Sequence, residues 1–127
     1  MRILVVEPGC VPYEKDIPST LGAMQAVVGG IIQVIYPFKE PVALICNDEG
    51  KLLGLPPNRA LRDGQGSIYD VVAGTFFLCG APAGAEDFAS LTDEQIQTFR
   101  NQFSGAEIFL RAGGVLLVLR TEQEELT

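Results

Sequence analysis

The sequence contains no histidine, and this absence excludes several catalytic classes at once. Ser-His-Asp and Cys-His catalysis need an imidazole as general base, and most zinc hydrolases need one as a metal ligand. Histidine is also the side chain whose charge ordinarily changes near neutral pH. We therefore expect a non-enzymatic protein that needs no cofactor.

Cysteine is scarce, and the three present (Cys10, Cys46 and Cys79) show no CxxC spacing. An odd number without paired spacing indicates neither a disulfide framework nor a thiolate zinc site. Cys46 and Cys79 lie in apolar segments and are predicted to be small buried residues of strands. Cys10 lies in a predicted turn, where we expect it to be exposed.

Basic residues and long apolar runs are also few. Nine Lys and Arg against sixteen Asp and Glu give a net charge of −7, which argues against a nucleic-acid polymer as partner because phosphate contacts need clustered cations. No apolar run approaches the roughly 20 residues of a membrane span, and the N-terminal apolar block is too short for a signal peptide. The sequence thus predicts a cytoplasmic protein without a membrane contact.

The acidic residues outside the C-terminus include two isolated adjacent pairs, Glu86-Asp87 and Asp93-Glu94, which give little support to a magnesium site.

What the chain does have is a hydrophobic content of 47% over 127 residues, enough for one well-packed core. No linker or internal repeat divides the sequence. We expect a single compact domain over residues 1–127, in which the terminal TEQEELT (121–127) is a mobile acidic tail.

In the N-terminal third, short β-branched runs predict strands at 2–8, 11–17 and 31–38, with 11–17 at a sheet edge. Apolar residues at helical spacing predict a helix over about 20–28. Ser19 is its expected N-cap, and Gly29 its expected left-handed exit.

Further along, two apolar runs flank Asn47-Asp48-Glu49-Gly50, which predicts a β-hairpin over 41–55. A strand is expected from about 71 to 79, with a bulge or a close backbone approach at Gly74. Thr92 and Gln95 form a predicted capping box at the start of a second helix. The expected core residues of this helix are Ile96, Phe99 and Phe103, and a closing hairpin is expected to turn at 112–114. These elements predict an α+β domain, with a mainly antiparallel sheet of six to eight strands packed with two helices.

The stretch KLLGLPPNRALRD (51–63) is the strongest candidate for a binding site. Its proline pair is expected to force the chain out of the sheet, and Asn58 tolerates the conformations of a turn. Arg59 and Arg62 stand three residues apart, which on a helical turn would place both guanidiniums on one face, where they could grip an anionic or planar group. The alternative is that they pair with Asp63, Asp70 or other carboxylates and only fix the turn.

Two tyrosines and a threonine extend this candidate site. Tyr36 ends a predicted strand and Tyr69 follows the arginine segment, so both could stack on a base at one rim. Tyrosines at strand ends are also common as half-buried covers of a core. Thr75 could offer a hydroxyl beside Gly74, where the backbone is expected to approach closely.

Several segments carry a resemblance to a known family. RILVVEPG, IYPFKEPVALICNDEGKLLGLPPNRALRD and IYDVVAGTFFLCG, followed by EDFASLT and IFLR, resemble domain of unknown function 3846, a family found in phages and conjugative elements of Gram-positive bacteria. The resemblance covers nearly the whole chain. It implies no enzyme activity, and it implies a mobile-element context in which small proteins often blunt host defence.

Three functions follow as hypotheses. The first is a homo-oligomeric sponge that sequesters a small anionic ligand, a nucleotide-derived immune signal, through Asn58, Arg59, Arg62, Tyr36, Tyr69 and Thr75. The second is an acidic inhibitor that covers a host protein through its acidic surface and the TEQEELT tail. The third is a hydrolase that uses carboxylates and a divalent metal.

Overall fold

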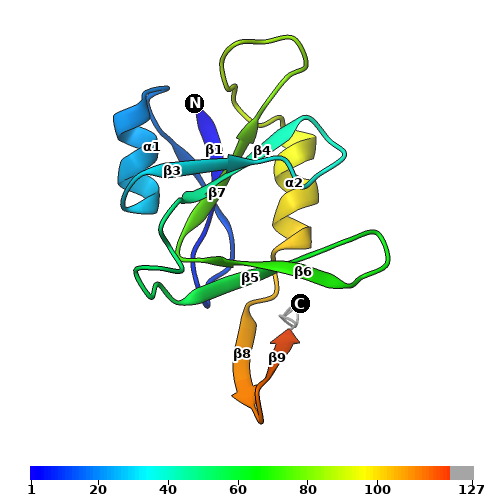
Figure 1. Cartoon of the computed structure of the whole chain (residues 1–127). Helices are drawn as coiled ribbons and strands as arrows, with labels where there is room; N and C mark the ends of the chain where they lie inside the picture. Colours follow the sequence, from blue (N-terminus) through cyan, green and yellow to red (C-terminus); the bar gives the residue numbers. More distant parts are fainter. Residues whose placement is uncertain (121–127) are drawn as a thin grey trace.

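The computed structural model describes residues 1–120, whose helices and strands are labelled in Figure 1. In chain order they are β1 (Arg2–Val6), β2 (Tyr13–Asp16), α1 (Leu21–Val28), β3 (Ile32–Ile35), β4 (Val42–Asn47), β5 (Pro57–Arg62), β6 (Ile68–Ala73), β7 (Phe76–Gly80), α2 (Asp93–Gln102), β8 (Glu107–Ala112) and β9 (Val115–Arg120). The expected acidic tail, 121–127, lies outside the described residues. The α+β class and the antiparallel pairing are confirmed. The nine strands of residues 1–120 form sheets of five, two and two strands rather than one sheet of six to eight.

The five-stranded sheet has the order β2-β1-β7-β4-β3, and all its neighbours are antiparallel. Every residue of β4 and of β7 is buried, because both faces of these strands are covered. Burial on both faces explains why their sequences are continuous apolar runs without alternation. β2 is exposed throughout and forms one edge of the sheet, as predicted.

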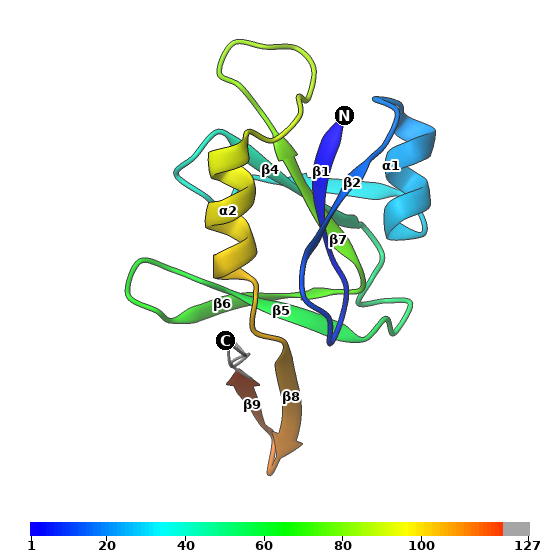
Figure 2. The ribbon, with the colours of Figure 1, turned by 180° about the vertical axis from the view of Figure 1, so that it is seen from behind.

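The two helices cover opposite faces of this sheet, as the two views in Figures 1 and 2 show. α1 packs on one face through Val28 and its partly buried neighbours. Ile96 and Phe99 of α2, with Phe103 directly after it, pack on the other face, as their spacing predicts. The β5–β6 sheet lies on the α2 side and contributes Leu61 to the same core. The end of α2 is therefore brought next to β5.

Local capping groups define both helices. Thr92 Oγ1 accepts the N–H of Gln95 and the Gln95 side chain accepts the N–H of Thr92, which confirms the capping box. α1 ends at Gly29, whose φ of 80° confirms the left-handed exit. The N-cap of α1 was predicted one residue too early: Thr20, not Ser19, has the extended backbone and accepts the N–H of the third helical residue. Within residues 1–120 no helix is both long and apolar enough to cross a membrane.

The three cysteines lie where the sequence predicts them. Cys46 and Cys79 are buried in strands, Cys10 is exposed, and none of the three forms a disulfide. Burial raises the pKa of the Cys79 thiol to about 12. Burial, followed by the nearby Asp48 carboxylate, also raises the pKa of Cys46. Neither buried thiol is therefore a nucleophile at neutral pH.

The predicted hairpin over 41–55 is wrong. β4 ends at Asn47 and the chain turns there, with the Asn47 side chain accepting the N–H of Glu49 at 2.8 Å. The following residues form consecutive turns instead of a return strand, and Leu52 is 88% exposed. The reason lies in the sheet, because β4 already has β3 on one side and β7 on the other and offers no free edge.

The helical turn expected for Arg59 and Arg62 is also wrong, because residues 57–62 form strand β5, which pairs with β6. Pro57 is the first residue of this strand, a position where a missing N–H is tolerated. The strand expected over 71–79 is divided at Gly74 into β6 and β7, which belong to different sheets. Gly74 has a φ of 83°, and a Cβ there would lie 2.7 Å from Leu55 Cδ1, so the group that approaches this glycine is a side chain and not the expected backbone.

β8 and β9 form a two-stranded hairpin that projects away from the five-stranded sheet, beyond β5 and β6 (Figures 1 and 2). Gly113 and Gly114 make its turn, as predicted, with φ of 58° and 81°. Positive φ at both central residues is typical of a type I′ turn, which matches the twist of the flanking strands.

Candidate functional site

The candidate site begins with a β-bulge at Asn58. In the β5–β6 ladder Pro57 pairs with Ala73 and Arg59 with Val72, so Asn58 is an extra residue without a partner. Its fully buried side chain donates from Nδ2 to the carbonyl oxygens of Val6 (2.8 Å) and Gly74 (2.9 Å). The bond to Val6 attaches the small β5–β6 sheet to β1 of the central sheet, and the bond to Gly74 holds the connection between β6 and β7.

Arg59 is almost completely buried, with 1% of its surface exposed. It donates to the Phe103 carbonyl from Nε (3.3 Å) and Nη2 (3.1 Å), to the Cys10 carbonyl (2.6 Å), and to the backbone and side-chain oxygens of Asn58 (3.1 and 2.8 Å). An arginine has five N–H groups, so every one is engaged, and each by a neutral oxygen. Burial lowers the pKa of Arg59 from its ordinary value, while the nearby Glu107 carboxylate opposes this shift. The guanidinium stays charged because an arginine is protonated at any physiological pH.

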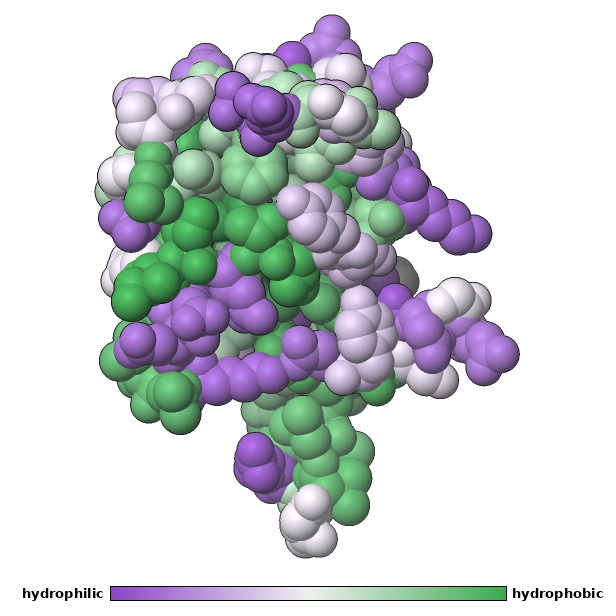
Figure 3. All heavy atoms as spheres, turned by 45° about the horizontal axis from the view of Figure 1, so that its top comes forward, coloured by the Kyte–Doolittle hydropathy of each residue, from purple (hydrophilic) through white to green (hydrophobic). Residues whose placement is uncertain are grey.

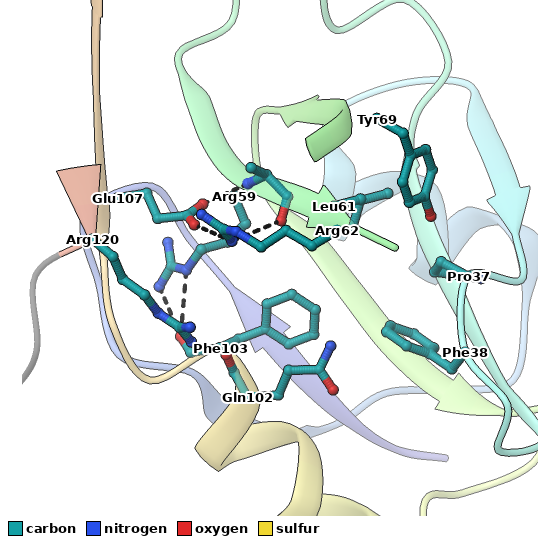
Figure 4. Close-up of a pocket in the computed structure, with 11 residues that line it drawn as sticks. Pro37, Phe38, Arg59, Leu61, Arg62, Tyr69, Gln102, Phe103, Glu107 and Arg120 are labelled. Atoms are coloured by element: carbon teal, nitrogen blue, oxygen red, sulfur yellow. Dashed lines mark hydrogen bonds and ion pairs between the residues drawn. The ribbon is translucent and has the colours of Figure 1, made fainter. Parts of the chain in front are cut away.

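Two of the arginines close the C-terminal end of α2. The last carbonyls of a helix have no partner within the helix, and this end carries a partial negative charge. Arg59 donates to the carbonyl of Phe103, and Arg120 of β9 donates to that of Gln102 (Figure 4). The positive charges of Arg59 and Arg120 therefore stabilise the C-terminal end of α2.

Glu107, the first residue of β8, connects the projecting hairpin to β5. Its side chain is 1% exposed; Oε2 accepts the N–H of Ala60 at 2.5 Å, and Oε1 forms an ion pair with Arg62 Nη1 at 2.6 Å (Figure 4). Arg62 is less enclosed, with 31% of its side chain exposed. Neither carboxylate considered from the sequence pairs with an arginine: Asp70 pairs with Lys51 at 2.6 Å, and Asp63 accepts backbone N–H groups of its own turn.

These groups surround a hollow of about 100 Å³, which we call the arginine pocket. Its lining residues come from β5, β6, β8, β9, the end of α2 and the segment after β3: Pro37, Phe38, Arg59, Ala60, Leu61, Arg62, Tyr69, Gln102, Phe103, Glu107 and Arg120. Three guanidiniums face one carboxylate, so the pocket carries a local positive charge in a protein of net charge −7.

The pocket leaves some donors for a ligand. Within residues 1–120, Arg62 uses only Nη1 and Arg120 only Nη2 in hydrogen bonds or ion pairs. Tyr69 and the Pro37-Phe38 segment form the opposite, mostly apolar wall, with Tyr69 57% exposed. The arrangement can pair guanidinium N–H groups with a small oxyanion and place a flat group against the tyrosine ring.

The structure gathers half of the predicted site residues. Arg59, Arg62 and Tyr69 line the arginine pocket, and Asn58 lies behind Arg59 with its amide already engaged. Two others do not line it. Tyr36 is 65% exposed beside the pocket wall, and Thr75 is partly buried between β6 and β7.

Sequence reasoning missed Glu107, Arg120 and Gln102, which come from the chain's last quarter. The one signal in the sequence is a carboxylate at the start of the apolar run EIFL, which indicates a partnered buried acid. Its partner could not be identified, because Ala60 lies 47 residues away.

Elsewhere in residues 1–120 the ion pairs are exposed, such as Arg2 with Glu14 and Asp93. No group of three Cys, Asp or Glu in this part of the chain is arranged to hold a metal ion. A second hollow, of about 480 Å³, lies between the hairpin and the β5–β6 sheet. Its lining is mainly apolar, with Lys51 and Arg111 as its cations.

Comparison with known proteins gives one match. No curated protein and no solved structure matches the chain significantly. The model of a domain of unknown function, DUF3846, matches residues 1–104, which run from β1 to just beyond α2. The segment IFLR and the rest of the hairpin lie outside this match, so the resemblance is narrower than the sequence suggested. Because the match covers most of the 127 residues, the chain belongs to the DUF3846 family.

Proposed function

We propose that this protein is a non-enzymatic binding protein for a small anionic ligand, held at the arginine pocket. The observation that carries the proposal is the excess of guanidinium over carboxylate groups in a partly enclosed hollow of an acidic protein. Among residues 1–120, Arg62 and Arg120 have donors that no group engages, and charge-assisted bonds to an oxyanion are the strong ones.

The size of the pocket limits which part of the ligand enters it. Pockets for whole ligands usually measure roughly 300–1,000 Å³, whereas this one measures about 100 Å³. A phosphate or carboxylate group fits, and the rest of the ligand would lie outside, where the exposed ring of Tyr69 offers a stacking surface. A nucleotide-derived signal has this combination of phosphate and flat base. Sequestration of such a signal in the cytoplasm of a host bacterium, by a protein of a phage or other mobile element, is the role that we infer.

Titration calorimetry with cyclic dinucleotides and cyclic ADP-ribose isomers tests the proposal. We expect wild-type protein to bind one of these ligands, and Arg120→Gln and Tyr69→Ala to weaken binding at least tenfold. Lys15→Ala removes an equal charge from the exposed edge strand β2 and should bind as wild type does. Absence of binding to all ligands, or equal loss in the Lys15 variant, would contradict the proposal. Recovery of intact ligand after heating the complex separates a sponge from a nuclease.

The inhibitor hypothesis places the contact on the acidic surface and on the tail, residues 121–127, which lies outside the described residues. Removal of these residues should abolish capture of a host protein if the tail makes the contact. The hydrolase hypothesis predicts turnover of the ligand that EDTA stops, and the calorimetry samples serve for that assay as well.

A further inference from the structure

The two faces of the β8–β9 hairpin differ sharply in chemistry. Directly paired residues of an antiparallel ladder point to the same side, and every second residue shares a face. One face, called the aliphatic face here, therefore carries three cross-strand pairs: Ile108 with Leu119, Leu110 with Leu117, and Ala112 with Val115. It contains no polar or charged side chain.

The opposite face carries all the charged residues of the hairpin. Glu107 and Arg120 reach the arginine pocket, and Arg111 lines the hollow beside the β5–β6 sheet together with Phe109 and Leu116. This face is thus the one that contacts the body of the protein. The aliphatic face is turned away from it.

The aliphatic face is unusually exposed for its composition. Its large residues are close to half exposed, with values of 47% for Ile108, 47% for Leu110, 58% for Val115, 46% for Leu117 and 52% for Leu119. In Figure 3 the projecting hairpin is mostly hydrophobic in colour. Five such residues represent roughly 450 Å² of apolar surface, the size of the largest apolar patch on a typical monomer, and a patch of this size often marks an interaction site.

We propose that the aliphatic face is the interface of a homodimer, in which the hairpins of two copies pack face to face about a twofold axis. A surface without hydrogen-bonding side chains needs an equally apolar partner, and the same face of a second copy supplies one. Among residues 1–120 the other exposed large hydrophobic residues belong to several different elements and loops. Two copies together would bury roughly 900 Å² through these residues, which is the size of a weak, reversible interface.

Charge favours the same geometry. Each copy has a net charge of −7, so most approaches of two copies are repulsive. The aliphatic face is free of charge, and Glu107, Arg111 and Arg120 all lie on the far side of the hairpin. A dimer also supports the hairpin itself, since an isolated two-stranded sheet is marginally stable in water. This proposal is independent of the ligand proposed above.

Light scattering coupled to size-exclusion chromatography tests the dimer with the full chain. We expect twice the 13.7 kDa chain mass for wild type and the monomer mass for Leu117→Lys and Leu110→Lys, at the centre of the face. Leu52→Lys, at a leucine that is 88% exposed outside the hairpin, is the matched control and should remain dimeric. Far-UV circular dichroism should show that all four proteins are folded.

Several outcomes would overturn the proposal. One is a wild-type monomer at every concentration, and another is a Leu117→Lys protein that stays dimeric. A dimer that forms only after residues 121–127 are removed would show that the tail, not a second copy, occupies the face. Hydrogen exchange gives a second measurement: amides of 107–120 should become at least tenfold better protected as wild-type concentration rises, and those of Leu117→Lys should not.

Discussion

Replacement of Glu107 should reveal how strongly the C-terminal hairpin stabilises the rest of the chain. In Glu107→Ala the buried N–H of Ala60 loses its acceptor at 2.5 Å, and Arg62 loses its carboxylate partner at 2.6 Å. An unsatisfied buried donor costs about 1–3 kcal/mol. The lost ion pair adds about 1 kcal/mol, near the value for surface pairs, because Arg62 is 31% exposed and can turn to water. We expect the free energy of unfolding to fall by about 3 kcal/mol, a large part of the 5–15 kcal/mol typical of a domain.

Glu107→Gln separates the two contributions. The glutamine keeps an amide oxygen for the Ala60 N–H but loses the charge that pairs with Arg62, so its cost should be about 1 kcal/mol. Glu86→Ala, in an exposed loop, is the control and should change stability by less than about 0.5 kcal/mol. Because the chain has no tryptophan, urea unfolding is best followed by far-UV circular dichroism. Equal stabilities for wild type and Glu107→Ala, or equal losses for the Ala and Gln variants, would refute the reasoning.

Three further predictions concern stability, each measured by urea unfolding. Asn58→Ala removes the donor for two buried carbonyls and should cost about 2–4 kcal/mol; a loss below about 1 kcal/mol would contradict the bulge as an anchor. Gly74→Ala should cost more than Gly9→Ala, because both have positive φ but only Gly74 has a side chain, Leu55, within 3 Å of the added Cβ. Cys79, with a pKa of about 12 when folded, should make stability fall by up to about 1.4 kcal/mol per pH unit above pH 9, because the unfolded thiol ionises first. Its replacement by alanine should remove that part of the slope between pH 8 and pH 10, and an unchanged slope would refute the assignment.

Local signals in the sequence were sufficient for the helices and for the closing hairpin. The capping box of Thr92 and Gln95, the exit at Gly29 and the Gly113-Gly114 turn each depend on residues within a few positions of one another. Such features depend little on the tertiary contacts of the segment, so the sequence predicts them correctly.

The two wrong predictions of secondary structure concern which strands pair with each other. Asn47 begins a real turn, but the strand expected after Gly50 has no free sheet edge to join. The hydrogen bonds of residues 57–62 are satisfied by β6 instead, which converts the expected helical turn into a strand. Neither outcome is encoded within the segment itself, because tertiary pairing outweighs local preference.

The candidate site was predicted only in part for the same reason. Arg59 and Arg62 were found because they are conspicuous in an acidic chain, but their acceptors are distant in sequence. The carbonyl of Phe103 lies 44 residues from Arg59, and Glu107 belongs to another sheet. The hydrogen-bond and ion-pair partners of the two arginines could therefore be identified only from the folded structure.

The position of Glu107 has a consequence for how this chain could be recombined with its relatives. The family match ends at residue 104, yet the carboxylate that satisfies Ala60 and Arg62 comes three residues later. In a chimaera of residues 1–104 with the C-terminal segment of another family member, the Ala60 N–H would have no hydrogen-bond acceptor and the Arg62 guanidinium would have no carboxylate partner. The new segment would have to supply a carboxylate at the position of Glu107. Residue 104, where the family match ends, is thus a poor place to divide the molecule.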